Sequence, residues 1–424
     1  MSDQTGIPLG QFSIKTPGNI RLLVLLLLVQ FLTITHGCGE NPAGPKGDNG
    51  TTARRSPRLG LWLAKKSELI EHESATFDLV MSAWFEPAEA ADIRDRHPST
   101  KLLAGLTLSW VSSDPGWQAL LVTVANGGDP DGPLQITEDM FLMYDDDNDG
   151  ILDRRCTFPG WEDPTIYAMD PRHTGWQELI LSFYDVIVSQ PQHDGAIVDM
   201  IDAYSFCNGS WSEGVPLPLD SSGWVFGQEQ LLSLLRDRIP ENKWIIANAG
   251  CDFPEDSPFP QYLNGYLLEN ALGIQCGLAV DELLASSQRA LENTNAPHIV
   301  VYAVDTDDTG EIDWPRFRTG LAASLLVDHS YFAFDFGPRD HGGVTDYWFP
   351  QYYDAVLGDP IASYYVVNGG YRRDFEKGLI VAAVSTPIPL SLDISHIDIA
   401  TGESGTDFTV PQGDARIFLR EDEQ

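Results

Sequence analysis

Two acidic residues at the ends of apolar runs are the strongest candidates for chemistry in this sequence. Asp199 lies in the apolar run Gly195–Ile201, where an ionised carboxylate is costly unless it has a partner or a function. Glu269 ends the run Gly265–Glu269, and Glu is a poor turn former, which disfavours a purely capping role. Two carboxylates facing one opening can hydrolyse a glycosidic bond. One protonates the leaving oxygen, and the other attacks the anomeric carbon or activates water.

Further polar and aromatic residues follow the same kind of run. Aromatic faces stack on the apolar faces of sugar rings, and polar groups near the carboxylates would orient a sugar. Asp305 and Asp335 serve equally well as caps of the turns that follow them. For Trp62, packing in the barrel is the favoured alternative to sugar binding. The candidate substrate-binding residues are Trp62, Trp110, Asp202, Tyr204, Asn248, Asp305 and Asp335.

An acidic segment, DDDNDGILD at 145–153, resembles the first half of a calcium-binding loop. Asp145, Asp147, Asp149 and Asp153 have the spacing of cation ligands, and Gly150 permits the sharp turn between them. Cys156 stands where an EF-hand has its twelfth-position Glu, so the segment is no EF-hand. It binds a structural Ca²⁺ ion or forms a solvated acidic hairpin tip. Catalysis itself requires no cofactor by this interpretation.

Parallel strands must position these residues, because short apolar runs alternate with segments of helical periodicity. The expected helices are Glu86–His97, Gly175–Gln190, Gln228–Arg238, Val280–Asn293 and Pro315–Asp328. The expected strands are Leu59–Ala64, Phe77–Ala83, Leu102–Ser109, Gly195–Ile201, Trp244–Ala249, Gly265–Glu269, Ile299–Asp305 and Tyr331–Phe336.

This pattern predicts an α/β fold, a (β/α)₈ TIM barrel spanning residues 58–358, with the polar strand ends at its mouth. A doubly wound open sheet is the alternative, disfavoured because no G-x-G-x-x-G follows the first strand. Phe141–Tyr144 is assigned to a hairpin in a long insertion after the third strand. Residues 359–424 carry short strands without helices between them, which predicts a small all-β, sandwich-like C-terminal domain.

The N-terminal sequence resembles an export signal. Leu22–Ile34 has the length and apolarity of a signal-peptide core, and Gly37-Cys38 resembles a lipoprotein cleavage site. Residues 1–37 would be removed, Cys38 would carry the lipid, and residues 38–57 would form a flexible linker. The alternative is an ordinary secretory signal. Either interpretation places the protein outside the cytoplasm, at the cell envelope or secreted.

Export makes disulfides expected for the remaining cysteines. Four remain, which allow three connectivities, and the pairs Cys156–Cys207 and Cys251–Cys276 are favoured because each would join neighbouring loops. Their spacing does not fit a zinc site.

The net charge of −36 excludes one class of partner. Such a surface repels polyphosphates and anionic lipid headgroups, so we expect no nucleic-acid partner and no membrane contact beyond the lipid anchor. A neutral or cationic carbohydrate remains compatible, and we expect a monomer.

Five segments together carry a resemblance to a known group of proteins. They are GLWLA in the first strand, DDDNDGILD followed by AMDPRHTGW, HDGAIVDMID in the fourth strand, NGYLLEN in the sixth, and YRRDFEKGLIV near the C-terminus. From about Arg58 to Leu419 the chain resembles the uncharacterised glycoside-hydrolase TIM-barrel families that carry a C-terminal β-domain.

The resemblance implies a barrel with a β-domain and activity on a polysaccharide. The acids on strands four and six are also placed as in the α-galactosidase clan. That placement implies Asp199 as nucleophile and Glu269 as acid/base. The clan has Asp where this chain has Glu269, which leaves the stereochemical outcome open. The alternative functions are a non-catalytic glycan-binding lipoprotein on the same scaffold, or a glycan-modifying enzyme such as a lyase or deacetylase.

Overall fold

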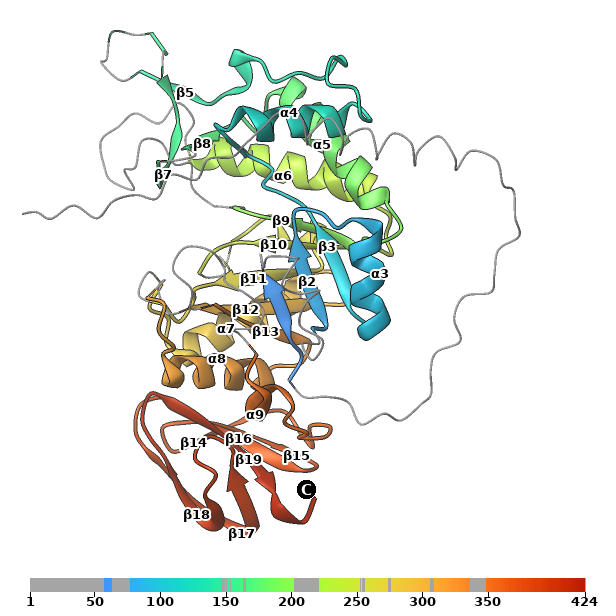
Figure 1. Cartoon of the computed structure of the whole chain (residues 1–424). Helices are drawn as coiled ribbons and strands as arrows, with labels where there is room; N and C mark the ends of the chain where they lie inside the picture. Colours follow the sequence, from blue (N-terminus) through green and yellow to red (C-terminus); the bar gives the residue numbers. More distant parts are fainter. Residues whose placement is uncertain are drawn as a thin grey trace, which may run out of the picture.

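A computed structural model gives the structure of the chain (Figure 1). It describes residues 57–62, 77–145, 149, 151–152, 154–162, 165–201, 221–251, 253, 256–273, 276–305, 309–335 and 348–423. The predicted signal peptide, Cys38 and the predicted linker up to residue 56 therefore lie outside the described residues. No helix within these ranges is both long and apolar enough to span a membrane.

An eight-stranded parallel sheet forms the centre of the fold, with strand order β1-β2-β3-β9-β10-β11-β12-β13. An isolated parallel bridge between Leu59 and Phe332 joins the first strand to the last, and Phe332 N donates to Arg58 O (3.0 Å). The sheet thus curls into a barrel, as predicted. The strands are β1 (Gly60–Trp62), β2 (Leu79–Ser82), β3 (Lys101–Ala104), β9 (Gly195–Val198), β10 (Trp244–Asn248), β11 (Gly265–Glu269), β12 (Ile299–Asp305) and β13 (Ser330–Asp335).

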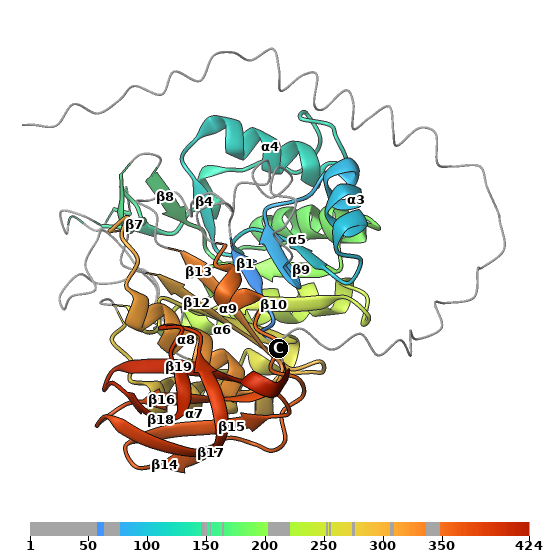
Figure 2. The same ribbon diagram turned by 60° about the horizontal axis from the view of Figure 1, so that its bottom comes forward.

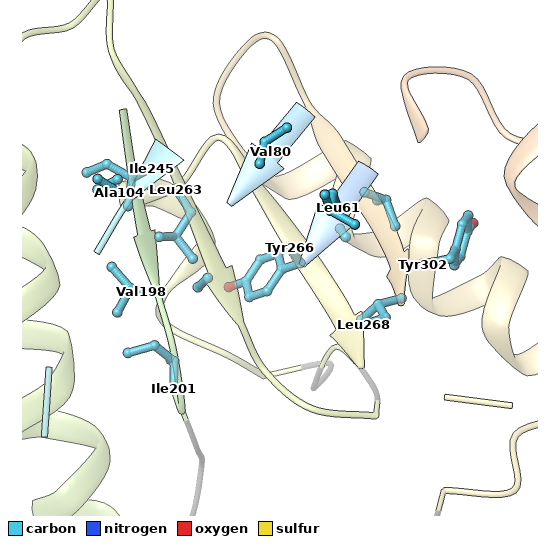
Figure 3. Packing of buried hydrophobic residues seen from close by; sticks show 14 of the residues in the cluster. Leu61, Val80, Ala104, Val198, Ile201, Ile245, Leu263, Tyr266, Leu268 and Tyr302 are labelled. Atoms are coloured by element: carbon cyan, nitrogen blue, oxygen red, sulfur yellow. The ribbon is translucent and has the colours of Figure 1, made fainter. Parts of the chain in front are cut away.

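Alternate residues of these strands form two separate apolar clusters. One fills the barrel interior and includes Met81, Ile197 and Leu267. The other packs the outer face of the barrel against the helices, and includes Val198 and Leu268 (Figure 3). Side chains of a strand point alternately to its two faces, and here both faces are covered. This explains why the sequence shows continuous apolar runs instead of a polar-apolar alternation.

Helices cover the barrel, and the sequence predicted five of them. They are α3 (Pro87–Arg96), α5 (Thr174–Ser189), α6 (Ser221–Arg238), α7 (Val280–Asn293) and α8 (Trp314–Leu326). The sequence interpretation missed α4 (Pro115–Ala125), although Asp114 caps it by accepting a bond from Gly116 N (2.6 Å). Between β10 and β11 the described residues contain one short 3₁₀ turn, η2 (Pro260–Tyr262), instead of an α-helix. A short helix, α9 (Pro350–Tyr353), follows the barrel.

The insertion after β3 carries small antiparallel elements. The predicted hairpin is present as β5 (Met143–Tyr144) paired with β6 (Arg154–Arg155). A second, three-stranded sheet of order β4-β8-β7 lies beside it. Its strands are β4 (Trp110–Ser112), β7 (Thr157–Glu162) and β8 (Thr165–Ala168).

Tyr184, on α5, supports the barrel where β3 and β9 diverge. Its hydroxyl accepts a hydrogen bond from Leu106 N (3.0 Å), donates to Leu106 O, and lies 3.2 Å from Ile197 O. The backbone at Gly105 lies close to Ile197, and only glycine fits there, because a Cβ would lie 1.9 Å from Ile197 O. Beyond this point the two strands meet again at the bridge between Thr107 and Asp199.

The C-terminal residues form one antiparallel sheet of order β14-β15-β16-β19-β17-β18. Its strands are β14 (Tyr365–Val367), β15 (Gly370–Phe375), β16 (Gly378–Ala383), β17 (Ile388–Asp398), β18 (Ser404–Val410) and β19 (Asp414–Arg420). They confirm the predicted all-β region. The sheet packs on the α8 side of the barrel, away from α4 and α5 (Figures 1 and 2).

Two arginines attach this sheet to α8. Arg373, on β15, is 3% exposed and donates to the last carbonyls of the helix, Leu325 O (3.0 Å) and Leu326 O (3.1 Å). Arg318, on α8, makes a bidentate pair with Asp414 on β19, with both bonds 2.8 Å long. A cation suits the C-terminal end of a helix, where carbonyl groups lack partners within the helix. The β-domain thereby satisfies carbonyls that α8 leaves open.

We expect Arg373→Ala to lower the free energy of unfolding by about 3 kcal/mol, because it leaves buried carbonyls without donors. Urea denaturation measures the change. Arg420→Ala is the matched control in the same sheet, since Arg420 is partly exposed beside exposed Asp422, and should cost less than about 1 kcal/mol. Equal effects of the two substitutions would contradict the clamping role of Arg373.

His193 generates a second prediction. It is 2% exposed; its Nδ1–H donates to Ile187 O, and its Nε2 accepts from Phe85 N (3.0 Å). Burial lowers the pKa of this imidazole, and Nε2 can keep its acceptor role only while the ring is neutral. The unfolded chain takes up a proton here below about pH 6.5, while the folded chain resists it.

Stability should therefore fall as the pH drops from about 7 to about 5.5, with His193 contributing about 1 kcal/mol of the loss. Urea titrations of wild type and His193→Asn at both pH values measure this contribution as the difference between their pH dependences. His329→Asn, at an exposed position, is the matched control for the effect of a His-to-Asn substitution itself. An unchanged dependence in His193→Asn would refute the prediction.

Candidate active site

Three neighbouring strands, β9, β10 and β11, end in the polar residues that the sequence singled out. Ile197, Ile246 and Leu267 face the barrel interior, and the residues two positions further along are Asp199, Asn248 and Glu269. Because side chains alternate with a period of two, these residues share the inward side at the carboxyl end of the barrel. The strands pair in register, with Val198 opposite Ala247 and Asn248 opposite Leu267.

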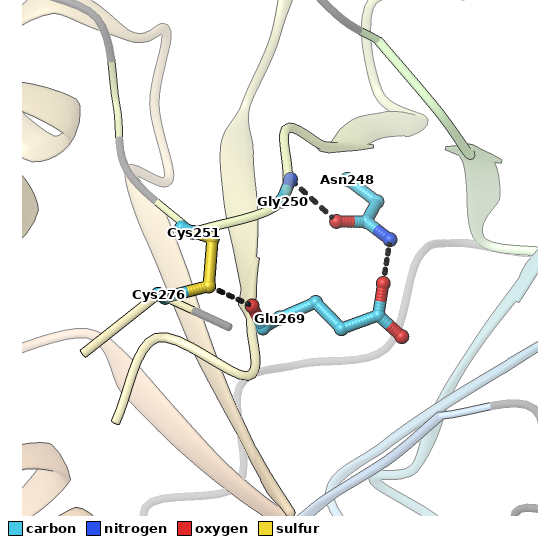
Figure 4. Close-up of a disulfide and its surroundings, with 5 residues drawn as sticks. All are labelled: Asn248, Gly250, Cys251, Glu269 and Cys276. Atoms are coloured by element: carbon cyan, nitrogen blue, oxygen red, sulfur yellow. Dashed lines mark hydrogen bonds between the residues drawn. A yellow bond between two sulfur atoms is a disulfide. The ribbon is translucent and has the colours of Figure 1, made fainter. Parts of the chain in front are cut away.

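Asn248 connects the two carboxylates. Its Nδ2 atom donates to Asp199 Oδ1 (2.9 Å) and to Glu269 Oε2 (2.6 Å), as Figure 4 shows for the second bond. Because both bonds start at one nitrogen, these carboxylate oxygens lie no farther apart than the two bond lengths together. The sequence predicted that the two acids share one opening, and the structure brings them together.

The orientation of the Asn248 amide is fixed by a backbone group. Gly250 N donates to Asn248 Oδ1 (2.9 Å), and a backbone N–H is always a donor. The acceptor end of the amide must therefore face Gly250, and the donor end must face the carboxylates. Asn248 is 4% exposed, so its amide contacts the protein instead of solvent.

Each carboxylate accepts a second N–H bond. Trp62, at the end of β1, donates from Nε1 to Glu269 Oε1 (3.0 Å), so both oxygens of Glu269 are engaged. Asp199 Oδ1 also accepts from Met200 N (2.9 Å). Trp62 is thus a site residue through its indole N–H, a role that the sequence did not indicate.

Left-handed backbone follows the site residues. Met200 (φ 57°) comes directly after Asp199, Asn270 (φ 54°) directly after Glu269, and Gly250 (φ 69°) two residues after Asn248. This conformation is unfavourable for a methionine, and such outliers cluster at functional sites. The chain therefore turns sharply away from the barrel immediately after it has presented each side chain.

A disulfide joins the loops that follow β10 and β11. Cys251 and Cys276 are bonded, as the sequence predicted, with their Cα atoms 5.5 Å apart (Figure 4). Cys276 Sγ lies 3.8 Å from Glu269 O, so the crosslink is adjacent to the site. Cys156 is also disulfide-bonded, and Cys207, its predicted partner, lies outside the described residues.

Tyr184 lies beneath Asp199. Burial is the main cause that raises the pKa of its hydroxyl far above the ordinary value, and the nearby negative charge of Asp199 adds to the effect. The hydroxyl stays protonated and holds the backbone next to Asp199 in place through its bonds to Leu106. It belongs to the support of the site.

The other predicted substrate-binding residues are placed as follows. Trp110 is 2% exposed and packs edge-to-face on Trp224, with ring centroids 5.7 Å apart, which leaves little of its surface for a ligand. Asp305 and Asp335 are paired in register at the ends of β12 and β13, while their side chains lie outside the described part. Asp202 and Tyr204 also lie outside it.

The acidic segment at 145–153 is described only in part. Asp149 N donates to Asp145 Oδ1 (3.2 Å), and Ile151 N donates to Asp149 Oδ1 (2.8 Å), which are bonds of a tight turn. Asp147 and Asp153 lie outside the described residues, so the calcium site stays a prediction. Among the residues that are described, no group of three or more His, Cys, Asp or Glu could hold a metal ion.

Comparison with known proteins gives similarity to solved structures alone. No family model matches the chain, and no curated protein matches it. A GH36 α-galactosidase from Geobacillus stearothermophilus shares 8% identity at a TM-score of 0.46, covering 87% of this chain and 57% of that one. A cyclic α-maltosyl-(1→6)-maltose hydrolase from Arthrobacter globiformis shares 11% identity at a TM-score of 0.46, covering 83% and 89%.

A cycloisomaltooligosaccharide glucanotransferase from Paenibacillus is also similar, at 10% identity and a TM-score of 0.38, covering 87% of this chain and 56% of that one. This chain thus spans little more than half of the α-galactosidase and of the glucanotransferase. The α-galactosidase and the maltosyl-maltose hydrolase are glycoside hydrolases. With TM-scores below 0.5, these similarities assign no activity to this chain.

The disulfide stabilises the fold by constraining the unfolded chain. We expect the double substitution Cys251→Ser/Cys276→Ser to lower the free energy of unfolding by about 3 kcal/mol, because the crosslink closes a loop of 25 residues. Urea denaturation without reductant measures the loss. Wild type treated with dithiothreitol should lose at least as much. A double variant as stable as untreated wild type would contradict the prediction.

Proposed function

We propose that this protein is a glycoside hydrolase that uses Asp199 and Glu269 as its catalytic pair. The observation that carries the proposal is the shared Asn248 Nδ2 donor, which holds one oxygen of each carboxylate at hydrogen-bond distance. Two acids this close at the carboxyl end of a barrel are the arrangement that glycosidic bond cleavage requires.

The separation of the carboxylates indicates the stereochemical course. The bonds from Asn248 to the two acids are 2.9 and 2.6 Å long. The two bonded oxygens therefore lie no farther apart than the about 5–5.5 Å that separates the carboxyl groups of retaining enzymes. Inverting enzymes keep their carboxyls about 6.5–9.5 Å apart to leave room for a water molecule. The proposal is therefore hydrolysis with retention.

In the proposed reaction, Asp199 attacks the anomeric carbon while Glu269 gives its proton to the leaving glycosidic oxygen. The carbon–oxygen bond breaks as the ester to Asp199 forms. Glu269, now ionised, then removes a proton from water, which attacks the same carbon and releases Asp199. The assignment of the two roles follows the resemblance to the α-galactosidase clan.

The substrate class follows from charge. With a net charge of −36, the chain would repel a polyanionic glycan, so we propose a neutral or cationic oligo- or polysaccharide as substrate. Export through the N-terminal segment and anchoring through Cys38 would place the enzyme where such a polymer is found. These are proposals from the sequence, as are the monomeric state and the absence of a nucleic-acid partner.

The test is hydrolysis of a panel of neutral and cationic glycans by wild type, Asp199→Asn and Glu269→Gln. Each substitution keeps the size of the side chain and removes the titrating acid, so we expect each to lower kcat by about 10³-fold or more. In wild type, ¹H NMR of the first product should show the anomer of the substrate.

Asp194→Asn is the matched control. Asp194 precedes β9 at the opposite end from Asp199 and pairs with Arg94 (2.6 Å) and Lys101 (3.2 Å), so its loss should affect stability and leave kcat unchanged. Full activity in both site variants would refute the assignment of the pair. Glycan binding by wild type without turnover on any substrate would favour the non-catalytic alternative.

A further inference from the structure

Asn248 uses its whole donor capacity on the two acids. A side-chain amide has two N–H groups, and Asn248 directs them to Asp199 Oδ1 (2.9 Å) and Glu269 Oε2 (2.6 Å). The amide oxygen is occupied by Gly250 N (2.9 Å). A residue bonded in this way has no N–H left for a sugar, which departs from the substrate-binding role that the sequence suggested.

We propose that Asn248 is a positioning residue that holds the carboxyl groups of Asp199 and Glu269 next to each other by donating one N–H to each. A role of Asn248 in catalysis rests on the proposed function. The effect of Asn248 on the two carboxyl groups can be measured whether or not the protein cleaves a glycan. Two carboxylates this close repel each other, and without compensation they tend to share one proton. A neutral donor bonded to one oxygen of each acid stabilises whichever acid is ionised, and it brings no positive charge that would drive the proton off the other.

Trp62 provides the comparison that makes this role measurable. Its indole N–H donates to Glu269 Oε1 alone (3.0 Å), so it acts on one acid of the pair. Removing the Trp62 donor should therefore perturb Glu269 selectively, whereas removing the Asn248 donor should perturb both acids. A residue that merely packed beneath the site would produce neither pattern.

The experiment compares Asn248→Leu, Asn248→Asp and Trp62→Phe with wild type, all as the full chain. Leu keeps the approximate volume and removes the donors; Asp keeps the shape and adds a third carboxylate. The pKa values of both acids are read by ¹³C NMR titration of carboxyl-labelled Asp and Glu. Spectra of Asp199→Asn and Glu269→Gln assign the two signals.

In Asn248→Leu we expect the pKa of both acids to rise by about 1 unit or more, because each loses a donor to its ionised form. In Asn248→Asp the first proton should bind at still higher pH, because like charges now crowd the site. In Trp62→Phe we expect a rise at Glu269 alone. Shifts below about 0.3 unit at both acids in Asn248→Leu and Asn248→Asp would overturn the proposal.

The pH dependence of kcat/KM gives the second measurement. In Asn248→Leu both limbs of the bell-shaped profile should move to higher pH, because the nucleophile ionises later and the acid keeps its proton longer. Trp62→Phe should move one limb: the basic limb if Glu269 is the proton donor, the acidic limb if it is the nucleophile.

The two measurements distinguish a failure of the proposed glycoside hydrolase function from a failure of the proposed role of Asn248. If wild type hydrolyses no glycan but the NMR titrations shift as expected, the proposed function falls and the role of Asn248 stands. If hydrolysis occurs and the Asn248 substitutions change neither the titrations nor the limbs, the role of Asn248 falls and the proposed function stands. A folded state in each variant is confirmed by its melting transition before titration.

Discussion

The side chains of the parallel strands alternate between two faces, and this alternation fixes both the core and the candidate active site. In β9, β10 and β11 it sends Ile197, Ile246 and Leu267 into the barrel interior, and their neighbours outward against the helices. Continued by one more step, the same alternation brings Asp199, Asn248 and Glu269 to one side of the mouth. A shift of one residue in any of these strands would bury its polar residue against a helix and separate the pair.

Presenting polar groups at the end of an apolar barrel carries a cost, and several features offset it. The two carboxylates accept hydrogen bonds from the Asn248 amide, and Glu269 accepts another from the Trp62 indole, which lowers the cost of placing these acids at the barrel end. Left-handed backbone at Met200 and Asn270 is unfavourable, and the Cys251–Cys276 crosslink fastens the two loops beside it. On the other side of the barrel, Arg373 and Arg318 fix α8 to the β-domain. The site thus stands on a part of the fold that is restrained from several directions.

Sequence patterns predicted the elements that depend on local periodicity. Gly265–Glu269, Ile299–Asp305 and the helix Val280–Asn293 coincide with β11, β12 and α7, because apolar spacing and flanking residues mark their ends. No helix was predicted between Trp244–Ala249 and Gly265–Glu269, and the described residues between β10 and β11 contain only the short η2 turn. α4 could have been found from Asp114 and Pro115 at its start.

In the candidate active site, too, the sequence predicted the residues but not the contacts between them. Polar ends of apolar strands revealed Asp199, Asn248 and Glu269, but the connection among them depends on side chains 21 and 49 positions apart and was invisible in the sequence. The Trp62 contact spans 207 positions, and the burial of Trp110 against Trp224 depends on how the insertion folds back. These contacts form only when the barrel has closed, so no pattern of neighbouring residues in the sequence indicates them.

Trapping of the covalent intermediate would show whether Asp199 is the nucleophile of a retaining reaction. Incubation with 2-fluoro glycosyl fluorides of the neutral sugars, followed by peptide mass spectrometry, should place a single glycosyl ester on the peptide that contains Asp199. An ester at another carboxylate outside the pair, or rapid turnover of a cleaved substrate with inversion and no ester, would contradict the account.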